Sequence, residues 1–175
     1  SVNNISLTHT TMDYYETTIT VASDAWYLNY TIEAFNSTDG VWSNTTETSI
    51  IVGDNDLPNV GDNVAMTPTT GDPFTFNATA SDNRKLFDVY VNYQTDVSSG
   101  PGYPLPTLNN TGANYYEHEI TIPSGATTLD YRYWANDTVL SGWSNWQASP
   151  GSSSWHTLSV VDNDRPTFID NTVGK

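Results

Sequence analysis

Apolar and polar residues alternate along several short stretches of this chain, and a period of two predicts β-strands. The clearest stretch is 74–80, where Phe74, Phe76, Ala78 and Ala80 share one face and Thr75, Asn77 and Thr79 share the other. A strand with this pattern buries its apolar face and exposes its polar face. We therefore expect residues 74–80 to form a strand with one buried side.

Four further stretches have the same alternation. Their inward residues are Phe87, Val89, Val91 and Tyr93; Ile120 and Ile122; Leu129, Tyr131, Tyr133 and Ala135; and His156, Leu158 and Val160. Turn-forming residues separate them at 81–83, 98–102 and 124–125. No stretch shows helical periodicity of useful length. Roughly seven strands in about a hundred residues predict an all-β fold, specifically an antiparallel β-sandwich.

The same pattern occurs twice, because the chain repeats one module. Residues 13–44 align without a gap on 114–145, an offset of 101, and 13 of the 32 positions are identical. A second match relates 53–58 to 161–166 at an offset of 108, because the later copy has seven extra residues near 147–153. A period of about a hundred residues predicts tandem globular domains, since solenoid repeats are only 20–50 residues long.

The repeat predicts three parts: 1–57 as the C-terminal part of a module, 58–165 as a complete module, and 166–175 as the start of another module or an assembly tail. The residues Pro166 to Asn171 are similar to Pro58 to Asn63. Joining the end of one chain to the start of another leaves module positions 68–101 missing. We therefore expect the chain to be a segment of a longer protein.

The incomplete first module is expected to have an uncovered apolar face. Its inward residues are Ile19, Val21, Leu28, Tyr30, Ile32, Ile50 and Val52. A three-stranded remnant of this kind is marginal in water, so something must cover it. The hypothesis we favour is a second copy that adds residues 166–175 as a strand, while residues 1–12 repack. Such a head-to-tail contact grows into a filament unless it closes into a ring.

Composition excludes several classes of partner. The chain has 5 Lys and Arg against 20 Asp and Glu, a net charge of −15, which argues against nucleic acids and anionic membranes. No apolar stretch is long enough to span a bilayer, so we expect no membrane insertion of this segment. The absence of cysteine excludes disulfides and thiolate chemistry.

Seven Asn-x-Ser/Thr sequons indicate N-linked glycans as partners. They begin at Asn4, Asn29, Asn36, Asn44, Asn77, Asn109 and Asn136. Asn29, Asn77 and Asn136 occupy the outward phase of their predicted strands, where an attached sugar meets solvent. This placement favours an extracellular or cell-surface location.

Two sequence patterns carry a family resemblance. Leu129-x-Tyr131-x-Tyr133-x-Ala135 followed by Gly142-Trp143-Ser144 resembles the last strands of fibronectin type III and related immunoglobulin-like modules, and 28–43 matches equally well. The stretch 74–93 and the Asp-Asn-Asp-x-Pro junctions resemble repeats of archaeal S-layer-like surface proteins. The resemblance implies an extracellular structural protein built from repeats, of archaeal origin.

The two Asp-rich junctions are candidate metal sites. Asp54 and Asp56, and again Asp162 and Asp164, place carboxylates at the module boundaries with an Asn between them, and Asp62, Asp82 and Asp170 are expected nearby. Calcium binds six to eight oxygens and suits such joints. The alternative is that Asp-Asn-Asp-x-Pro is only a turn between strands. No cofactor is required by either interpretation.

Aromatic residues suggest a second function. Trp134 lies in the outward phase of its strand, and Trp143, Trp146 and Trp155 cluster around the last turn. Exposed aromatic rings bind sugars by stacking, so a carbohydrate-binding or adhesion module is the alternative function. Trp42 and Trp143 recur at one repeat position, however, which favours packing.

No catalytic arrangement can be named. His9, His118 and His156 are scattered, and Glu117 and Glu119 share an outward face that solvation explains. We therefore predict that the chain is not an enzyme, although it could be a spacer from a large extracellular enzyme.

Overall fold

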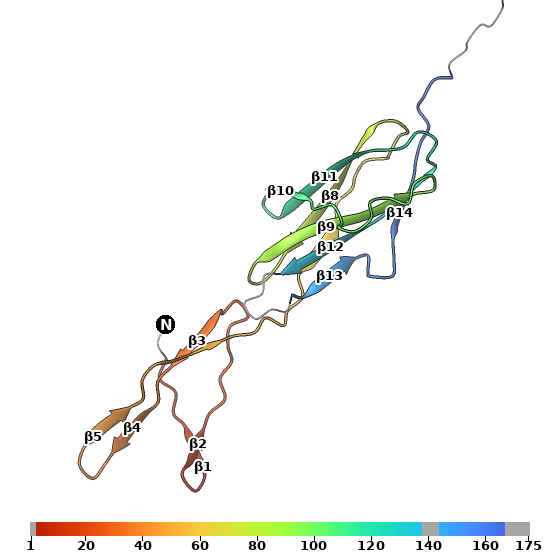
Figure 1. Ribbon diagram of the computed structural model, residues 1–175. Coiled ribbons are helices and arrows are strands. Elements are labelled where there is room, and N and C mark those ends of the chain that lie inside the picture. Colours follow the sequence, from red (N-terminus) through yellow and green to blue (C-terminus); the bar gives the residue numbers. More distant parts are fainter. Residues whose placement is uncertain (1–2, 138–143, 167–175) are drawn as a thin grey trace, which may run out of the picture. The chain divides into compact units, whose positions relative to one another are not determined.

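The computed structural model describes residues 3–137 and 144–166. Within these residues the chain has fourteen strands and no helix (Figure 1), which confirms the all-β prediction. The chain divides into two compact units, Ser1–Gly53 and Asp54–Lys175. Each unit is described by itself.

The second unit contains two antiparallel sheets. The first has the strand order β10-β11-β8-β7. Its strands are β7 (Asn59–Asp62), β8 (Pro73–Ser81), β10 (Asn109–Gly112) and β11 (Tyr115–Thr121). The second is built around the long strand β12 (Thr128–Asp137), which pairs with β9 (Leu86–Thr95) on one edge. Its other edge pairs with β14 (His156–Ser159) and then β13 (Trp146–Ser149).

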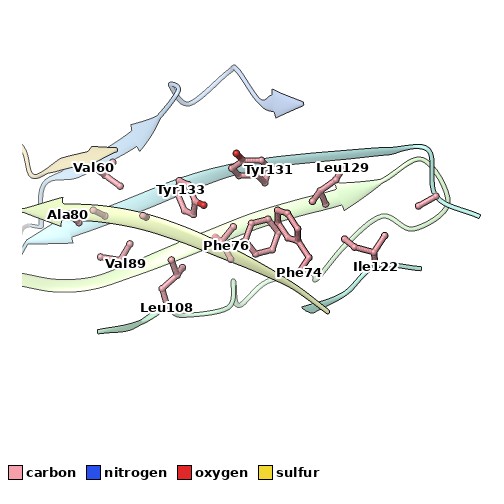
Figure 2. Packing of buried hydrophobic residues seen from close by; sticks show 14 residues of the cluster. Val60, Phe74, Phe76, Ala80, Val89, Leu108, Ile122, Leu129, Tyr131 and Tyr133 are labelled. Carbon is pink, nitrogen blue, oxygen red and sulfur yellow. The ribbon is translucent and has the colours of Figure 1, made fainter. Parts of the chain in front are cut away.

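Side chains from both sheets form one core (Figure 2). On β8 the side chains of Phe74, Phe76, Ala78 and Ala80 are at most 2% exposed, as the alternation predicts. On the opposing sheet Val89, Val91, Leu129, Tyr131, Tyr133 and Ala135 are at most 1% exposed. The ring centroid of Phe76 lies 5.3 Å from that of Tyr131. The two sheets of the second unit thus pack face to face as a closed sandwich.

A hydrogen-bonded tyrosine also joins the two sheets. The hydroxyl of Tyr133 on β12 accepts a hydrogen bond from the backbone N–H of Asn77 on β8 and lies 3.1 Å from the carbonyl oxygen of the same residue, to which it donates. Burial, the largest cause, raises the pKa of Tyr133 above its ordinary value. The hydroxyl therefore stays neutral and able to donate.

The predicted inward position of Phe87 is wrong. Its side chain is 64% exposed, whereas Val89 is 1% exposed. Asp88 pairs with Asn136, but the next pair is Leu86 with Asp137, so Phe87 is the extra residue of a β-bulge. A bulge reverses the facing of the residues beyond it, and Leu86 packs against the core instead.

The first unit has only short strands in three separate two-stranded sheets (Figure 1). They are β1 (Thr8–Thr11) with β2 (Tyr14–Glu16), β3 (Tyr27–Tyr30) with β6 (Thr48–Ile51), and β4 (Glu33–Asn36) with β5 (Val41–Asn44). These strands correspond to the later strands of the second unit, in shorter pieces.

The sequence repeat extends to backbone pairing. The β1–β2 ladder begins with Thr8 opposite Glu16, and β10–β11 begins with Asn109 opposite Glu117, the same register after the offset of 101. Both ladders shift register at the same place, beside turn residues of positive φ, Met12 at 49° and Ala113 at 44°. The two hairpins are therefore copies in structure as well as in sequence.

The β3–β6 ladder repeats the β12–β14 ladder. Leu28 pairs with Ile50 as Leu129 pairs with Leu158. The β4–β5 ladder differs, since Ala34 pairs with Ser43 whereas its equivalent Ala135 pairs with Gln147, three residues further along than the repeat predicts. The seven-residue insertion supplies the extra length and also separates β13 from β14.

The boundary between the units falls at Gly53, before the module boundary predicted at Leu57. Asp54 forms an ion pair with Arg84, and Asp56 accepts a hydrogen bond from Asn83. These contacts attach the junction 54–56 to the second unit.

Candidate functional site

The strongest candidate for a functional surface is the apolar face of the first unit, here called the open face. The name covers the residues that the repeat makes equivalent to inward-facing residues of the second unit: Ile19, Val21, Leu28, Tyr30, Ile32, Ile50 and Val52. Four of these are clearly solvent-exposed: Ile19 at 39%, Tyr30 at 39%, Ile32 at 46% and Ile50 at 47%. The other three are half-buried.

Four of the seven equivalent positions of the second unit are buried, and the other three, Ile120, Leu158 and Val160, are half-buried. Leu129 and Tyr133, equivalent to Leu28 and Ile32, are 0% exposed, and Tyr131, equivalent to Tyr30, is 1% exposed. Ile122, equivalent to Val21, is also 0% exposed. The contrast is largest for Tyr30 and Ile32, which are exposed while Tyr131 and Tyr133 are buried.

The difference arises from β8 and β9, which have no equivalent in residues 1–53. In the second unit β8 pairs with all of β11, and β9 pairs with nearly all of β12. Without a β8-like partner, β2 ends at Glu16, whereas β11 continues to Thr121. Without a β9-like partner, the equivalent of β12 is divided into β3 and β4 by Thr31 and Ile32.

The open face represents a substantial loss of stability. Complete burial of an aliphatic or aromatic side chain stabilises by about 1.5–3 kcal/mol. Several such side chains are left in water, so the first unit lacks on the order of 10 kcal/mol of the stabilisation available to its equivalent. An apolar surface of this kind is a candidate binding surface.

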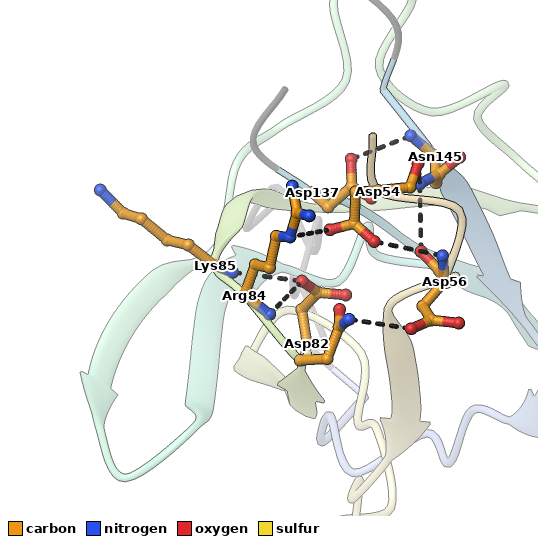
Figure 3. A network of polar contacts seen from close by, with 8 residues as sticks. Asp54, Asp56, Asp82, Arg84, Lys85, Asp137 and Asn145 are labelled. Carbon is orange, nitrogen blue, oxygen red and sulfur yellow. Dashed lines mark hydrogen bonds and ion pairs between the residues drawn. The ribbon is translucent and has the colours of Figure 1, made fainter. Parts of the chain in front are cut away.

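The first Asp-rich junction forms a polar network with the second unit (Figure 3). Arg84 Nε lies 3.7 Å from Asp54 Oδ2, and both side chains are at most 5% exposed. Asn145 Nδ2 donates to the backbone carbonyl oxygens of Asp54 and Asp56 at 3.3 and 3.1 Å, and to the buried carboxylate of Asp137 at 2.6 Å. Sequence reasoning missed Arg84 and Asn145, although Asn145 recurs as Asn44.

The second junction contacts a different loop of the same unit. The hydroxyl of Thr70 lies 3.3 Å from a carboxylate oxygen of Asp162 and equally far from one of Asp164. Asn163 donates to Asp72 at 2.7 Å. Hydrogen bonds from Thr69 first, and then from Asn163, lower the pKa of Asp72, which keeps this exposed carboxyl ionised.

The predicted calcium ligands are therefore held by protein partners. In the parts of the chain that the structure describes, no three Asp, Glu, His or Cys side chains are grouped to hold a metal ion. Asp62 contacts Tyr131 at 2.8 Å, and Asp82 accepts from the backbone of Arg84 and Lys85. Asp170 lies outside the described residues. Calcium at the joints stays a prediction.

The sequons differ in accessibility. Asn4, Asn29, Asn36, Asn44 and Asn109 are exposed. Asn77 is half-buried and donates to Glu117. The expectation that Asn136 meets solvent is wrong: it is 6% exposed, and its Oδ1 accepts from the backbone N–H of Asp88 at 3.0 Å. Asn136 is on the outward side of β12, where it lies between Asp88 on β9 and Trp146 on β13.

Two of the predicted aromatic residues, Trp134 and Trp155, lie beside an arginine of the second unit. The guanidinium of Arg132 lies 4.3 Å from the ring centroid of Trp155 and 5.5 Å from that of Trp134. Trp146 is 47% exposed and stacks on Tyr90 at 5.7 Å. Burial, followed by a hydrogen bond to Asp88, raises the pKa of Tyr90 to about 12. Trp143 lies outside the described residues, and its equivalent Trp42 is 65% exposed beside Phe35.

The three histidines occupy unrelated places. His156 stacks on Tyr131 and lies 3.7 Å from a carboxylate oxygen of Asp62. Burial lowers the pKa of His118. His9 stacks edge-on against Tyr15 in the first unit. Among them, only His156 has a carboxylate neighbour within ion-pair distance, and none joins a nucleophile-base arrangement in the contacts above.

Comparison with protein-family models and with curated proteins gave no match for this chain. The described part of the chain holds no helix that could cross a bilayer.

Proposed function

We propose that the chain is a structural segment of an extracellular repeat protein of a cell surface or surface filament. Its modules belong to the immunoglobulin-like and fibronectin type III-like class. Copies associate head to tail, and strands of one copy complete the open unit of the next. The observation that carries this proposal is the open face, because four of its seven equivalents in the second unit are buried.

Several features support this class of function. The second unit has two antiparallel sheets with a shared core, which is the general architecture of immunoglobulin-like modules. Five exposed sequons favour a glycosylated surface. The Asp-Asn-Asp-x-Pro junctions resemble those of archaeal S-layer-like repeats, which favours a protein of that class. A net charge of −15 keeps unassembled chains soluble.

The test is the assembly state of the purified chain, observed by electron microscopy and sedimentation velocity. We expect regular, concentration-dependent assemblies. Ile50→Asp places a charge on the open face and is expected to abolish them. Ser49→Asp is the matched control, because it adds the same charge to the same strand one residue earlier, where the side chain points to the other side of the sheet.

Monodisperse monomers at high concentration contradict self-association, as do assemblies that are equally sensitive to both substitutions. Removal of residues 166–175 tests their part in the contact; apart from Pro166, these residues lie outside the described part of the chain. Imaging with and without a chelator tests calcium at the joints, since loss of order on chelation is the expected effect of a bound ion.

The aromatic cluster favours a second candidate function, carbohydrate binding. Trp146 on β13 is 47% exposed and stacks on Tyr90, and the guanidinium of Arg132 lies over the rings of Trp134 and Trp155. A glycan array tests this function: binding that is lost in Trp146→Ala or Trp134→Ala supports it. Trp42→Ala, in the first unit, is the control. Absence of any glycan binding leaves packing as the explanation of the cluster.

A further inference from the structure

We propose that an N-linked glycan on Asn44 packs on an exposed aromatic pair of the first unit, Phe35 and Trp42, so that the chain's own sugar covers these two rings. The inference rests on the proposed function in one respect, because it needs the glycosylated surface. It does not depend on association between copies.

The aromatic pair joins the two strands of the hairpin β4–β5. Phe35 on β4 pairs with Trp42 on β5, and the centroids of their rings lie 4.9 Å apart with 40° between the ring planes. Phe35 is 51% exposed and Trp42 is 65% exposed. Rings that stay in contact with water forgo the stabilisation of burial, so a group that covers them stabilises the hairpin.

The side chain of Asn44 lies on the same side of the hairpin as the pair. Side chains alternate along a strand, so Trp42 and Asn44 share one side of β5, about 7 Å apart along the strand. Asn44 pairs with Glu33, which shares a side of β4 with Phe35. A sugar bonded to the Nδ2 atom of Asn44 therefore begins beside the ring of Trp42.

The fold also presents Asn44 for modification. Asn44-Thr45-Thr46 is a sequon, and its three residues are exposed. The backbone after Asn44 is held in place, because the Thr45 N–H donates to the carbonyl oxygen of Ile32 at 2.9 Å and the Ile32 N–H donates to the Thr45 hydroxyl at 3.0 Å. A fixed attachment point lowers the entropy that is lost when the sugar settles on the rings.

The chemistry of a sugar suits this pair. The face of an aromatic ring carries partial negative charge, and one face of a pyranose ring presents weakly polarised C–H groups. Stacking brings these two faces together and removes apolar area from water. The hydroxyl groups of the sugar project from its edge and keep their hydrogen bonds with solvent.

The second unit lacks both halves of this arrangement. The equivalent of Asn44 is Asn145, which starts no sequon because Gln147 stands at the third position. The amide of Asn145 instead donates to the backbone of the first junction. The equivalent of Phe35 is Asn136, which is 6% exposed. The exposed ring and the exposed sequon thus occur together in the first unit, and neither occurs at these two positions of the second.

The glycan leaves the open face free. Ala34 and Phe35 are consecutive on β4, so their side chains lie on opposite sides of the strand. Ala34 is equivalent to Ala135, which is 0% exposed in the core of the second unit. The aromatic pair is therefore on the side of β4 away from the core positions, and a glycosylated chain can still associate through the open face.

Asn36 gives a matched control within the same hairpin. It also starts a sequon and is exposed, and it follows Phe35 directly. Because it is one residue from Phe35, its side chain lies on the other side of β4, where its amide donates to Asp39 at 3.0 Å and accepts from the N–H of Thr38. A sugar on Asn36 is as near in sequence but points away from the rings.

The test uses the full chain from a eukaryotic host that attaches N-glycans, trimmed to a single N-acetylglucosamine and studied as monomer. Asn36→Gln keeps the sugar on Asn44, and Asn44→Gln keeps the sugar on Asn36. By NMR we expect sugar protons with nuclear Overhauser contacts to the Trp42 ring and upfield ring-current shifts in Asn36→Gln, and neither in Asn44→Gln. Trp42→Leu should abolish both signals. The sugar on Asn44 should also slow amide exchange in β4 and β5 about twofold to tenfold.

A second route serves if the host leaves Asn44 bare. The chain has no cysteine, so Asn44→Cys and Asn36→Cys each create one attachment point. Alkylation of each thiol with an iodoacetamide of ¹³C-labelled N-acetylglucosamine places one visible sugar on the chain. We expect the ring-current shift for attachment at position 44 alone.

Contacts from position 44 only support the inference. A sugar at position 44 without ring contacts overturns it, as do equal contacts from position 36, and either result leaves the glycosylated surface of the proposed function standing. Mass spectrometry of the natural protein separates the remaining outcomes. A bare Asn44 beside other occupied sequons contradicts the inference alone, whereas the absence of sugar from every sequon contradicts the glycosylated surface as well.

Discussion

Gly100 occupies a position in the loop after β9 where a side chain has no room. Its φ is +73°, and an added Cβ would lie 1.7 Å from the backbone oxygen of Tyr93. We expect Gly100→Ala to lower the unfolding free energy of the second unit by at least about 2 kcal/mol, since both the left-handed backbone and the clash oppose it. Urea denaturation followed by tryptophan fluorescence measures the change.

Gly102→Ala is the matched control. Gly102 is in the same loop, and an added Cβ would meet nothing within 4 Å. We expect a change of no more than about 0.5 kcal/mol. Similar effects at both glycines would show that Gly100 does not approach the backbone of Tyr93.

Asp96 ties the end of β9 to the start of β12. Its carboxylate accepts hydrogen bonds from the Thr127 hydroxyl at 2.7 Å and from the backbone N–H groups of Thr127 and Thr128. The Thr127 hydroxyl is the largest cause, and together these bonds lower the pKa of Asp96 to about 2. Because the folded pKa lies below the unfolded value of 3.8, the stabilisation is complete above pH 3.8 and is lost as the pH falls through about 2.

NMR titration of the Asp96 carboxyl carbon tests this interaction. We expect a pKa near 2 in the native chain and a return toward 3.8 in Thr127→Val, which removes the hydroxyl donor. Thr121→Val, on an exposed position of β11, is the control and should leave the titration unchanged. An Asp96 pKa that stays low in Thr127→Val would contradict the assigned cause.

Residue positions were predicted well only where their environment is local. Asn29 on β3 is exposed, as its outward phase predicts, whereas Asn136 has the outward phase but is buried. Asn136 is buried because the backbone of Asp88 on β9 and Trp146 on β13 approach it from the two sides of β12. Neither approach has a signal in the sequence around Asn136.

At the scale of strands, β9 shows where alternation fails. Phe87 and Val91 have the same phase in the sequence, but Phe87 is 64% exposed and Val91 is 0% exposed. We expect Val91→Thr to destabilise the second unit by about 1–3 kcal/mol, because it places a hydroxyl in the core. Phe87→Thr should change the stability by no more than about 0.5 kcal/mol. Thermal unfolding followed by circular dichroism compares them, and a larger effect at Phe87 would place it in the core instead.

The alternation of apolar and polar residues predicted that β8 and β12 are strands and which of their side chains face the core, because each strand buries one side along most of its length. Alternation could not predict the bulge in β9 or the division of the last strand into β13 and β14. A bulge depends on the pairing partner, and the division depends on an inserted loop. The repeat supplied what alternation lacked, since two ladders of the first unit keep the registers of their equivalents.

At the scale of the whole chain, strand length follows from the available partners and not from local sequence. Tyr14-Tyr15-Glu16 and Tyr115-Tyr116-Glu117 are identical, yet β2 stops at Glu16 while β11 continues to Thr121 beside β8. The open face was predictable from the sequence because the repeat showed which strands are missing. The polar network of Arg84 and Asn145 was not, because its members are brought together only by the fold.

Hydrogen exchange of the chain, measured first as dilute monomer and then as assembly, tests the central claim most directly. In the monomer we expect β12 and β14 to be protected about 10⁴-fold more than β3 and β6, since a closed unit has at least about 5 kcal/mol of stability and an open one has little. On assembly, the protection of β3 and β6 should rise. Equal protection of both units in the monomer would contradict the account, because the first unit would then be closed without a partner.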